Sequence, residues 1–155
     1  MNTCDPKKRI IVDADACPSL TSIINLARKT RTQVVLVGNE TQNLSRFNGV
    51  AHVSVIEVPS GKDSADFTIT PLATEHDIVI TQDIGLASLV LPKGTVAISP
   101  RGKIFNPETI EYDLLLRYES QKARRAGLKT KGPSSYSMKD KQSLLEVLEG
   151  LLCKD

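Results

Sequence analysis

Short hydrophobic runs alternate with amphipathic segments along the first two thirds of the chain. Five runs rich in β-branched residues predict buried strands, at residues 9–12, 33–37, 53–58, 78–81 and 95–99. Apolar residues at helical spacing between them predict helices, at residues 18–29, 41–47, 64–73 and 84–89. Pro71, inside the third of these helices, predicts a kink or a late start. Strands and helices that alternate in this order predict a mainly parallel sheet with helices on both faces.

The last third of the chain has no strand pattern and predicts two further helices, at residues 107–126 and 138–152. Ser137 and Asp140 are spaced as in a capping box at the start of the second helix. Apolar residues of that helix cover more than one stripe, which indicates either deep packing or a homodimer contact. A chain of 155 residues fits a single α/β domain with three α/β/α layers. We expect its core at about 9–100 and a helical C-terminal extension at about 101–155.

Composition narrows the class of protein. Hydrophobic residues make up 40% of the chain and charged residues 25%, as in soluble globular proteins. The apolar runs are far shorter than the ~20 residues of a membrane span, and the N-terminus lacks the apolar core of a signal peptide. The three cysteines, Cys4, Cys17 and Cys153, have no zinc-site spacing and fit a reducing compartment. We therefore expect a cytoplasmic protein with no membrane partner.

Acidic residues gather where the predicted strands end. Asp13 and Asp15 follow the first strand, Asp83 follows the fourth, and Asp63 and Asp66 open the helix after the third. In open α/β sheets, ligands bind beyond the carboxyl ends of the strands, so these side chains converge on one edge. A single Asp in such a place is commonly a helix cap or turn residue. Two of them after separate strands, Asp13 and Asp83, favour a site.

Carboxylates that lie close together raise one another's pKa and destabilise a fold unless a cation neutralises them. An all-oxygen ligand set without His or Cys favours Mg²⁺ or Mn²⁺. Such ions activate water and stabilise an in-line phosphoryl displacement. The sequence therefore predicts a metal site made by Asp13, Asp63, Asp66 and Asp83, with Asp15 beside it. Asp77 lies at the opposite end of its strand, and we expect it to be structural.

Basic residues add a candidate surface for a polyanion. Residues 121–131, QKARRAGLKTK, contain five basic residues and no acidic one, which favours attraction of a phosphate backbone. At the end of a helix, however, such cations also complement the helix dipole. We expect the nucleic-acid contacts, with RNA as the partner, to come from Lys62, Arg101, Lys103, Arg124, Arg125, Lys129 and Lys131.

Five motifs occur in a fixed order: IIVDADACP, GKDSADFTI, DIVITQDIGLASLVLPKG, SPRG and RRAGLKTKGPSSYSMKDKQSLLEVLEGLL. Together they resemble the YaiI/YqxD family of small bacterial proteins from about residue 10 to residue 152. The resemblance implies a PIN-like nuclease fold, whose members use strand-end acids to bind Mg²⁺ or Mn²⁺ and cut RNA. It matches Asp13 and Asp83 to two of those acids and Asp63 or Asp66 to a third. A further acid is missing from IGLASLV, so either Asp15 replaces it or the site binds metal weakly.

The leading hypothesis is a metal-dependent phosphodiesterase, a ribonuclease in which Asp13, Asp83 and one of the helix acids hold the metal. Asp15 then orients or deprotonates water. A second hypothesis takes Asp13-Ala14-Asp15 as the DxD opening of a haloacid-dehalogenase-type phosphatase, but Gly38 and Asn39 stand where that class needs Ser or Thr. A Toprim-like site fits less well, because it expects Glu after the first strand. The third hypothesis is a non-catalytic module that binds nucleic acid or a partner, which explains the missing acid better.

Overall fold

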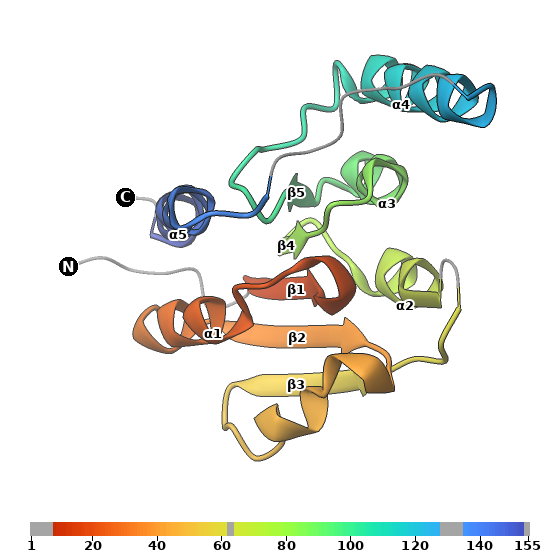
Figure 1. Cartoon of the computed structure of the whole chain (residues 1–155). Coiled ribbons are helices and arrows are strands. Elements are labelled where there is room, and N and C mark those ends of the chain that lie inside the picture. The colour runs from red at the N-terminus through yellow and green to blue at the C-terminus, as the bar shows by residue number, and fades with distance from the viewer. Residues whose placement is uncertain (1–7, 62–63, 128–134, 154–155) are drawn as a thin grey trace.

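A computed structural model describes residues 8–61, 64–127 and 135–153 and contains a five-stranded parallel sheet with the order β3-β2-β1-β4-β5 (Figure 1). This confirms the predicted α/β class with a sheet between two helical layers. Each strand starts and ends within one residue of its predicted limits. The strands are β1 (Arg9–Asp13), β2 (Gln33–Gly38), β3 (Val53–Glu57), β4 (Asp77–Ile80) and β5 (Val96–Ile98).

The strands are buried on both faces because side chains alternate between two separate hydrophobic cores. In β1, Ile10 and Val12 join one core, whereas Ile11 joins the other. The same alternation places Leu36 and Val37 of β2 in different cores. This explains why the strand segments are continuous apolar runs rather than alternating apolar and polar residues.

Helices cover both faces of the sheet (Figure 1). The first core lies under α1 (Leu20–Lys29) and α5 (Met138–Leu152), and the second lies under α2 (Ser64–Leu72) and α3 (Ile84–Val90). Leu144, Leu148 and Leu152 of α5 are buried in the first core. Deep packing therefore accounts for the broad apolar surface of α5, and a homodimer stays a prediction.

Three predicted helices differ from the structure. Residues 41–47 form two 3-10 turns, Glu40–Gln42 and Leu44–Phe47, separated by Asn43 in the left-handed conformation at φ 52°. The late start that Pro71 predicts for the third helix is not observed, because α2 begins at Ser64 and Pro71 stands one residue before its end. The helix expected from residue 107 starts only at residue 110, since the Asn106 side chain accepts the Glu108 N–H in a turn.

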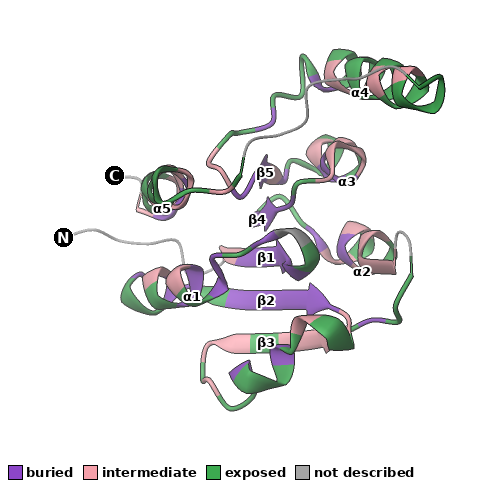
Figure 2. Ribbon diagram, in the orientation of Figure 1, coloured by how far each residue is buried: buried purple, intermediate pink, exposed green. Residues whose placement is uncertain are grey.

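The helix α4 (Ile110–Arg125) stands apart from the body of the domain and packs mainly against α3 (Figure 1). Figure 2 shows that most of its surface is exposed. The sequence places Leu115 and Tyr118 on its apolar face, but both are exposed, as is Phe67 of α2. Hydrophobic periodicity thus overestimates how much of α4 is covered. Within the described ranges, no helix has the length and apolar character needed to span a membrane.

The strand order puts a crevice where the sites of open α/β sheets form. From β1 the chain goes through β2 to β3 on one side and then returns to β4 on the other side of β1. Connections therefore leave the carboxyl ends of β1 and β4 in opposite directions, and ligands bind at such switch points. Asp13 ends β1, and Asp83 follows β4. The topology thus brings the two strand-end acids to the same opening.

A partly buried ion pair lies at the opposite end of the strands, where Arg9 is 30% exposed and Asp77 is buried. The Arg9 guanidinium donates to both carboxylate oxygens of Asp77, at 2.9 and 3.0 Å, and also to the Leu72 carbonyl oxygen at 2.9 Å. The Thr74 N–H and hydroxyl donate to the same carboxylate at 2.8 and 3.0 Å. Asp77, whose side chain is 1% exposed, is therefore structural as predicted.

Replacement of Asp77 by Ala should lower the free energy of unfolding by about 2–3 kcal/mol, because it leaves a guanidinium and an N–H without their buried acceptor. Urea denaturation measures this loss. The matched control is Glu75→Ala, since Glu75 is 72% exposed at the same edge. A loss for the Asp77 variant no larger than for the control would show that this ion pair does not stabilise the fold.

Candidate functional site

Asp13 lies at the centre of the candidate site. It is the last residue of β1 and only 7% exposed, and its carboxylate accepts a hydrogen bond from the Thr81 hydroxyl at 3.0 Å. Burial raises the pKa of Asp13, and the nearby carboxylates of Asp15 and Asp83 raise it further. Hydrogen bonds from Thr81 and from the Asp15 backbone only partly offset this effect. Asp13 is thus a buried acid whose ionised form is disfavoured by its surroundings.

Asp83 combines a helix cap with a contact to another helix. Its carboxylate accepts the Gly85 N–H at 2.8 Å at the N-terminus of α3. The same carboxylate oxygen pairs with the Arg117 guanidinium of α4 at 3.0 Å. Asp83 is therefore a helix cap, the common role of an Asp after a strand. The same hydrogen bond holds its side chain at the crevice. Arg117 is the cation that fixes α4 beside the acids.

Asp15 is exposed in a 3-10 turn, Ala14–Ala16, directly after β1. Its carboxylate accepts a hydrogen bond from the Gln42 side chain at 3.1 Å, and the Gln42 oxygen accepts the Asn39 N–H at 2.6 Å. A Cβ at Gly38 would lie 2.9 Å from that oxygen, so a larger residue at the end of β2 would require the Gln42 side chain to shift. The DxD phosphatase needs Ser or Thr at this position, where this chain has Gly38.

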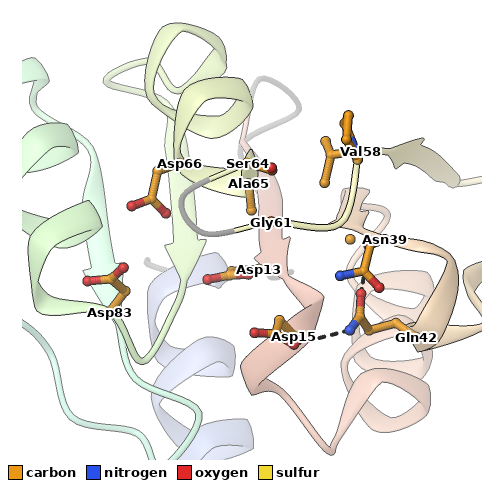
Figure 3. Close-up of a pocket in the computed structure, with 12 residues that line it drawn as sticks. Asp13, Asp15, Asn39, Gln42, Val58, Gly61, Ser64, Ala65, Asp66 and Asp83 are labelled. Atoms are coloured by element: carbon orange, nitrogen blue, oxygen red, sulfur yellow. Dashed lines mark hydrogen bonds between the residues drawn. The ribbon is translucent and has the colours of Figure 1, made fainter.

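The acids share one pocket of about 110 Å³ at the carboxyl edge of the sheet. Asp66 reaches it from the first turn of α2. Figure 3 shows the carboxylates of Asp13, Asp66 and Asp83 directed toward a common space, with Asp15 beside them. The other residues that line the pocket are Gly38, Asn39, Gln42, Val58, Pro59, Gly61, Ser64 and Ala65. Asp63 lies outside the described residues.

The donor set of this pocket suits Mg²⁺ or Mn²⁺, since its charged ligands are carboxylates alone. Among the residues that the structure describes, no three His, Cys, Asp or Glu side chains are grouped closely enough to form a ready metal site. Mg²⁺ does not need such a group, because it commonly retains water and is held by one or two carboxylates together with substrate phosphate. The residues fit an open, water-rich site rather than a closed cage.

The predicted phosphate contacts divide into four groups. Arg124 lines a pocket of about 580 Å³ that Asp13, Asp15 and Asp83 also line. Arg101 lines another beside Asp15 and pairs with Asp140 at 3.3 Å. Lys103 and Arg125 are exposed and line neither of these pockets. Lys62, Lys129 and Lys131 lie outside the described residues.

Three site residues escape the sequence analysis. Arg117 is seven residues before Arg124, so that the two cations lie on one face of α4. This helical spacing is visible in the sequence and could have identified Arg117. Thr81 stands between the end of β4 and Asp83, where its hydroxyl reaches Asp13. Gln42 contacts Asp15 only because the segment after β2 folds back over β1. No local pattern predicts that last contact.

Comparison with known proteins gives the family. The family model described as "Uncharacterized BCR, YaiI/YqxD family" matches residues 11–154. A UPF0178 protein of Bacillus cytotoxicus is 41% identical over 144 residues, which cover 93% of this chain and 92% of the relative. One from Myxococcus xanthus is 38% identical and covers 91% and 92% of the two chains. A third, from Staphylococcus aureus, is 39% identical and covers 90% and 93%.

No solved structure matches the chain significantly, and the PIN-like assignment stays a prediction. The family match and these relatives each cover nine tenths or more of this sequence. The family match at residues 11–154 starts inside β1 and includes all of the other described strands and helices. The chain belongs to the YaiI/YqxD family of bacterial proteins.

Proposed function

We propose that the carboxylate pocket binds Mg²⁺ or Mn²⁺ and that the protein hydrolyses phosphodiester bonds in RNA. The observation that carries this proposal is the environment of Asp13, a buried acid with two further carboxylates nearby and no cation among its described partners. Such an arrangement costs stability, and sites that retain this cost are commonly functional. A divalent cation would remove the repulsion.

In this proposal Asp13 and Asp83 hold the cation, and Asp66 binds it directly or through water. The bound ion would lower the pKa of a coordinated water and neutralise charge on the phosphate. Thr81 keeps the Asp13 carboxylate in place, and Arg117 and Gly85 do the same for Asp83. Gln42 fixes one oxygen of Asp15 at the rim. These contacts preorganise the acids before substrate arrives.

The hydrolysis needs water as its co-reactant. The water oxygen forms a bond to phosphorus while the bond from phosphorus to the leaving ribose oxygen breaks. Asp15, the exposed acid of the site, orients the water and accepts its proton, and solvent protonates the leaving oxygen. Arg117 and Arg124 lie on the α4 face that lines the adjoining pocket, where they would contact the phosphates on either side of the cleaved bond.

The second candidate is a module that binds nucleic acid without cutting it. It is favoured by the Arg117 guanidinium, which already provides Asp83 with a cation. The absence of a ready three-ligand group among the described residues also agrees with it. Both candidates use the same basic face of α4, so that RNA binding alone does not separate them. The two candidates are separated by whether the protein responds to metal through Asp13.

The first prediction concerns Asp13→Asn, which keeps the shape of the side chain and removes its charge. Mg²⁺ or Mn²⁺ should raise the melting temperature of the wild type but not of the variant, because a ligand that binds only the folded state stabilises it. Cleavage of single-stranded RNA should fall on the order of 100-fold, as when one charge-stabilising group is removed. Differential scanning fluorimetry and gel-resolved cleavage measure the two effects.

Glu75→Gln is the matched control, since it removes one carboxylate at the far edge of the sheet and should behave as the wild type. If metal stabilises the wild type but the wild type does not cleave RNA, the protein is a metal-binding module and the nuclease is contradicted. Equal cleavage by the wild type and the Asp13 variant would identify a contaminating nuclease. A wild type that neither gains stability with metal nor cuts RNA contradicts the proposal.

The second prediction concerns pH. Because the pKa of Asp13 in the folded state lies above the ordinary carboxyl value of 3.8, ionised Asp13 destabilises the fold at neutral pH. Without metal, Asp13→Asn should therefore be more stable than the wild type at pH 7.5, by about 0.5–2 kcal/mol. The difference should shrink as the pH falls and vanish well below pH 3.8, where the carboxyl is protonated in both states. Urea denaturation in EDTA across this range tests the sign.

A further inference from the structure

An apolar groove adjoins the carboxylate pocket. It has a volume of about 620 Å³ and lies between α2 and α3, with one side chain contributed by α4. Asp66 and Asp83 line both the groove and the carboxylate pocket, so that the two are continuous. Figure 3 shows these two acids on neighbouring elements at that boundary. The remaining lining residues are Phe67, Thr70, Pro71, Gly85, Ser88, Leu89 and Arg117.

The groove exposes large apolar side chains. Phe67 is 78% exposed and Leu89 is 52% exposed, although each belongs to a helix that packs on the sheet. Exposed apolar groups that cluster beside polar ones mark ligand grooves or interaction sites. Thr70 also lines the groove, but its hydroxyl oxygen is buried beneath the surface and has no hydrogen-bond partner within the described part of the chain, so the polar groups that the groove offers are those of Asp66, Asp83, Ser88 and Arg117. A ligand with both an apolar face and polar edges suits this combination.

Charge restricts the ligand further. Arg117 lines the groove and also the pocket that Arg124 lines with the acids, and it pairs with Asp83 at the same point. A ligand in the groove would thus have its apolar part against Phe67 and an anion within reach of the guanidinium. An unpaired nucleobase joined to its phosphate has this arrangement, since every base has a stacking face and polar edges.

We infer that this groove binds an unpaired base of single-stranded RNA next to the phosphate presented to the acids. The inference rests on the proposed function and names its substrate class. Phe67 stacks on the base, Ser88 lines the groove beside it, and Arg117 holds the neighbouring phosphate. Bases in a duplex are already stacked and paired, so double-stranded RNA does not fit. The selectivity of the site for single strands comes from the groove, whereas the chemistry comes from the acids.

Binding is tested in the Asp13→Asn background with EDTA, where cleavage does not interfere. Fluorescence anisotropy compares a labelled single-stranded RNA 10-mer, its duplex and a strand of the same length with abasic residues. The single strand should bind more tightly than either of the others. Phe67→Ala should weaken its binding about 5- to 100-fold, the effect of removing one stacking aromatic, with little change for the abasic strand. Because Phe67 is exposed, this substitution should leave the melting temperature unchanged.

Two control variants separate base from phosphate recognition. Tyr112→Ala removes another exposed aromatic, from α4 and outside the groove, and should leave binding unchanged. Arg117→Gln should weaken the single strand and the abasic strand alike and reduce the salt slope by about one. Phe67→Trp should retain binding, since a larger ring still stacks.

The outcomes distinguish the groove from the nuclease. The inference is overturned if RNA binds equally well with and without Phe67, or if the duplex binds as tightly as the single strand. Either result counts even if the wild type cuts RNA. Loss of self-association in Phe67→Ala, seen by sedimentation, assigns the groove to a second copy of the chain and also overturns it. Base-dependent binding through Phe67 in a protein that never cleaves RNA supports the groove and contradicts the nuclease.

Discussion

The parallel pairing of β1 with both β2 and β4 is the constraint on which the site depends. Its register aligns Arg9 with Gln33 on one side and with Asp77 on the other, so that all three strands end at the same edge. Backbone hydrogen bonds between the strands fix this alignment, and a reversed β4 would put Asp83 at the far edge. Asp13 and Asp83, separated by 70 residues in sequence, come together because this register aligns the ends of β1 and β4.

Two aspartates on neighbouring strands show how the ends of the sheet differ. Asp77 is almost fully buried, yet a guanidinium, a hydroxyl and a backbone N–H surround its carboxylate. Asp13 is buried as well, but a hydroxyl and a backbone N–H face it together with two further acids, which raise its pKa. The first arrangement stabilises the fold, and the second stores unfavourable charge. That contrast distinguishes a structural acid from one that a ligand would stabilise.

The helix α4 connects the carboxylate pocket to its surroundings. It packs on α3 and directs Arg117 to Asp83, while the face that carries Arg117 and Arg124 lines the pocket beside the acids. The same guanidinium borders the apolar groove between α2 and α3. A single side chain therefore lies at the junction of acid, basic and apolar surfaces. This junction is the basis for the proposal that the ligand is a phosphate joined to a base.

Hydrophobic periodicity by itself determined the parallel sheet and each strand limit to within one residue, because burial on both faces requires continuous apolar runs. It overestimated the cover of α4 and could not find the contacts of Gln42 with Asp15 or of Arg117 with Asp83, which join elements distant in sequence. It also gave Phe67 no distinct role, since an apolar residue on a helix pattern is normally core. Only the packing of α2, α3 and α4 decided that this ring stays exposed beside the acids, because the partner of a side chain depends on tertiary geometry rather than on local sequence.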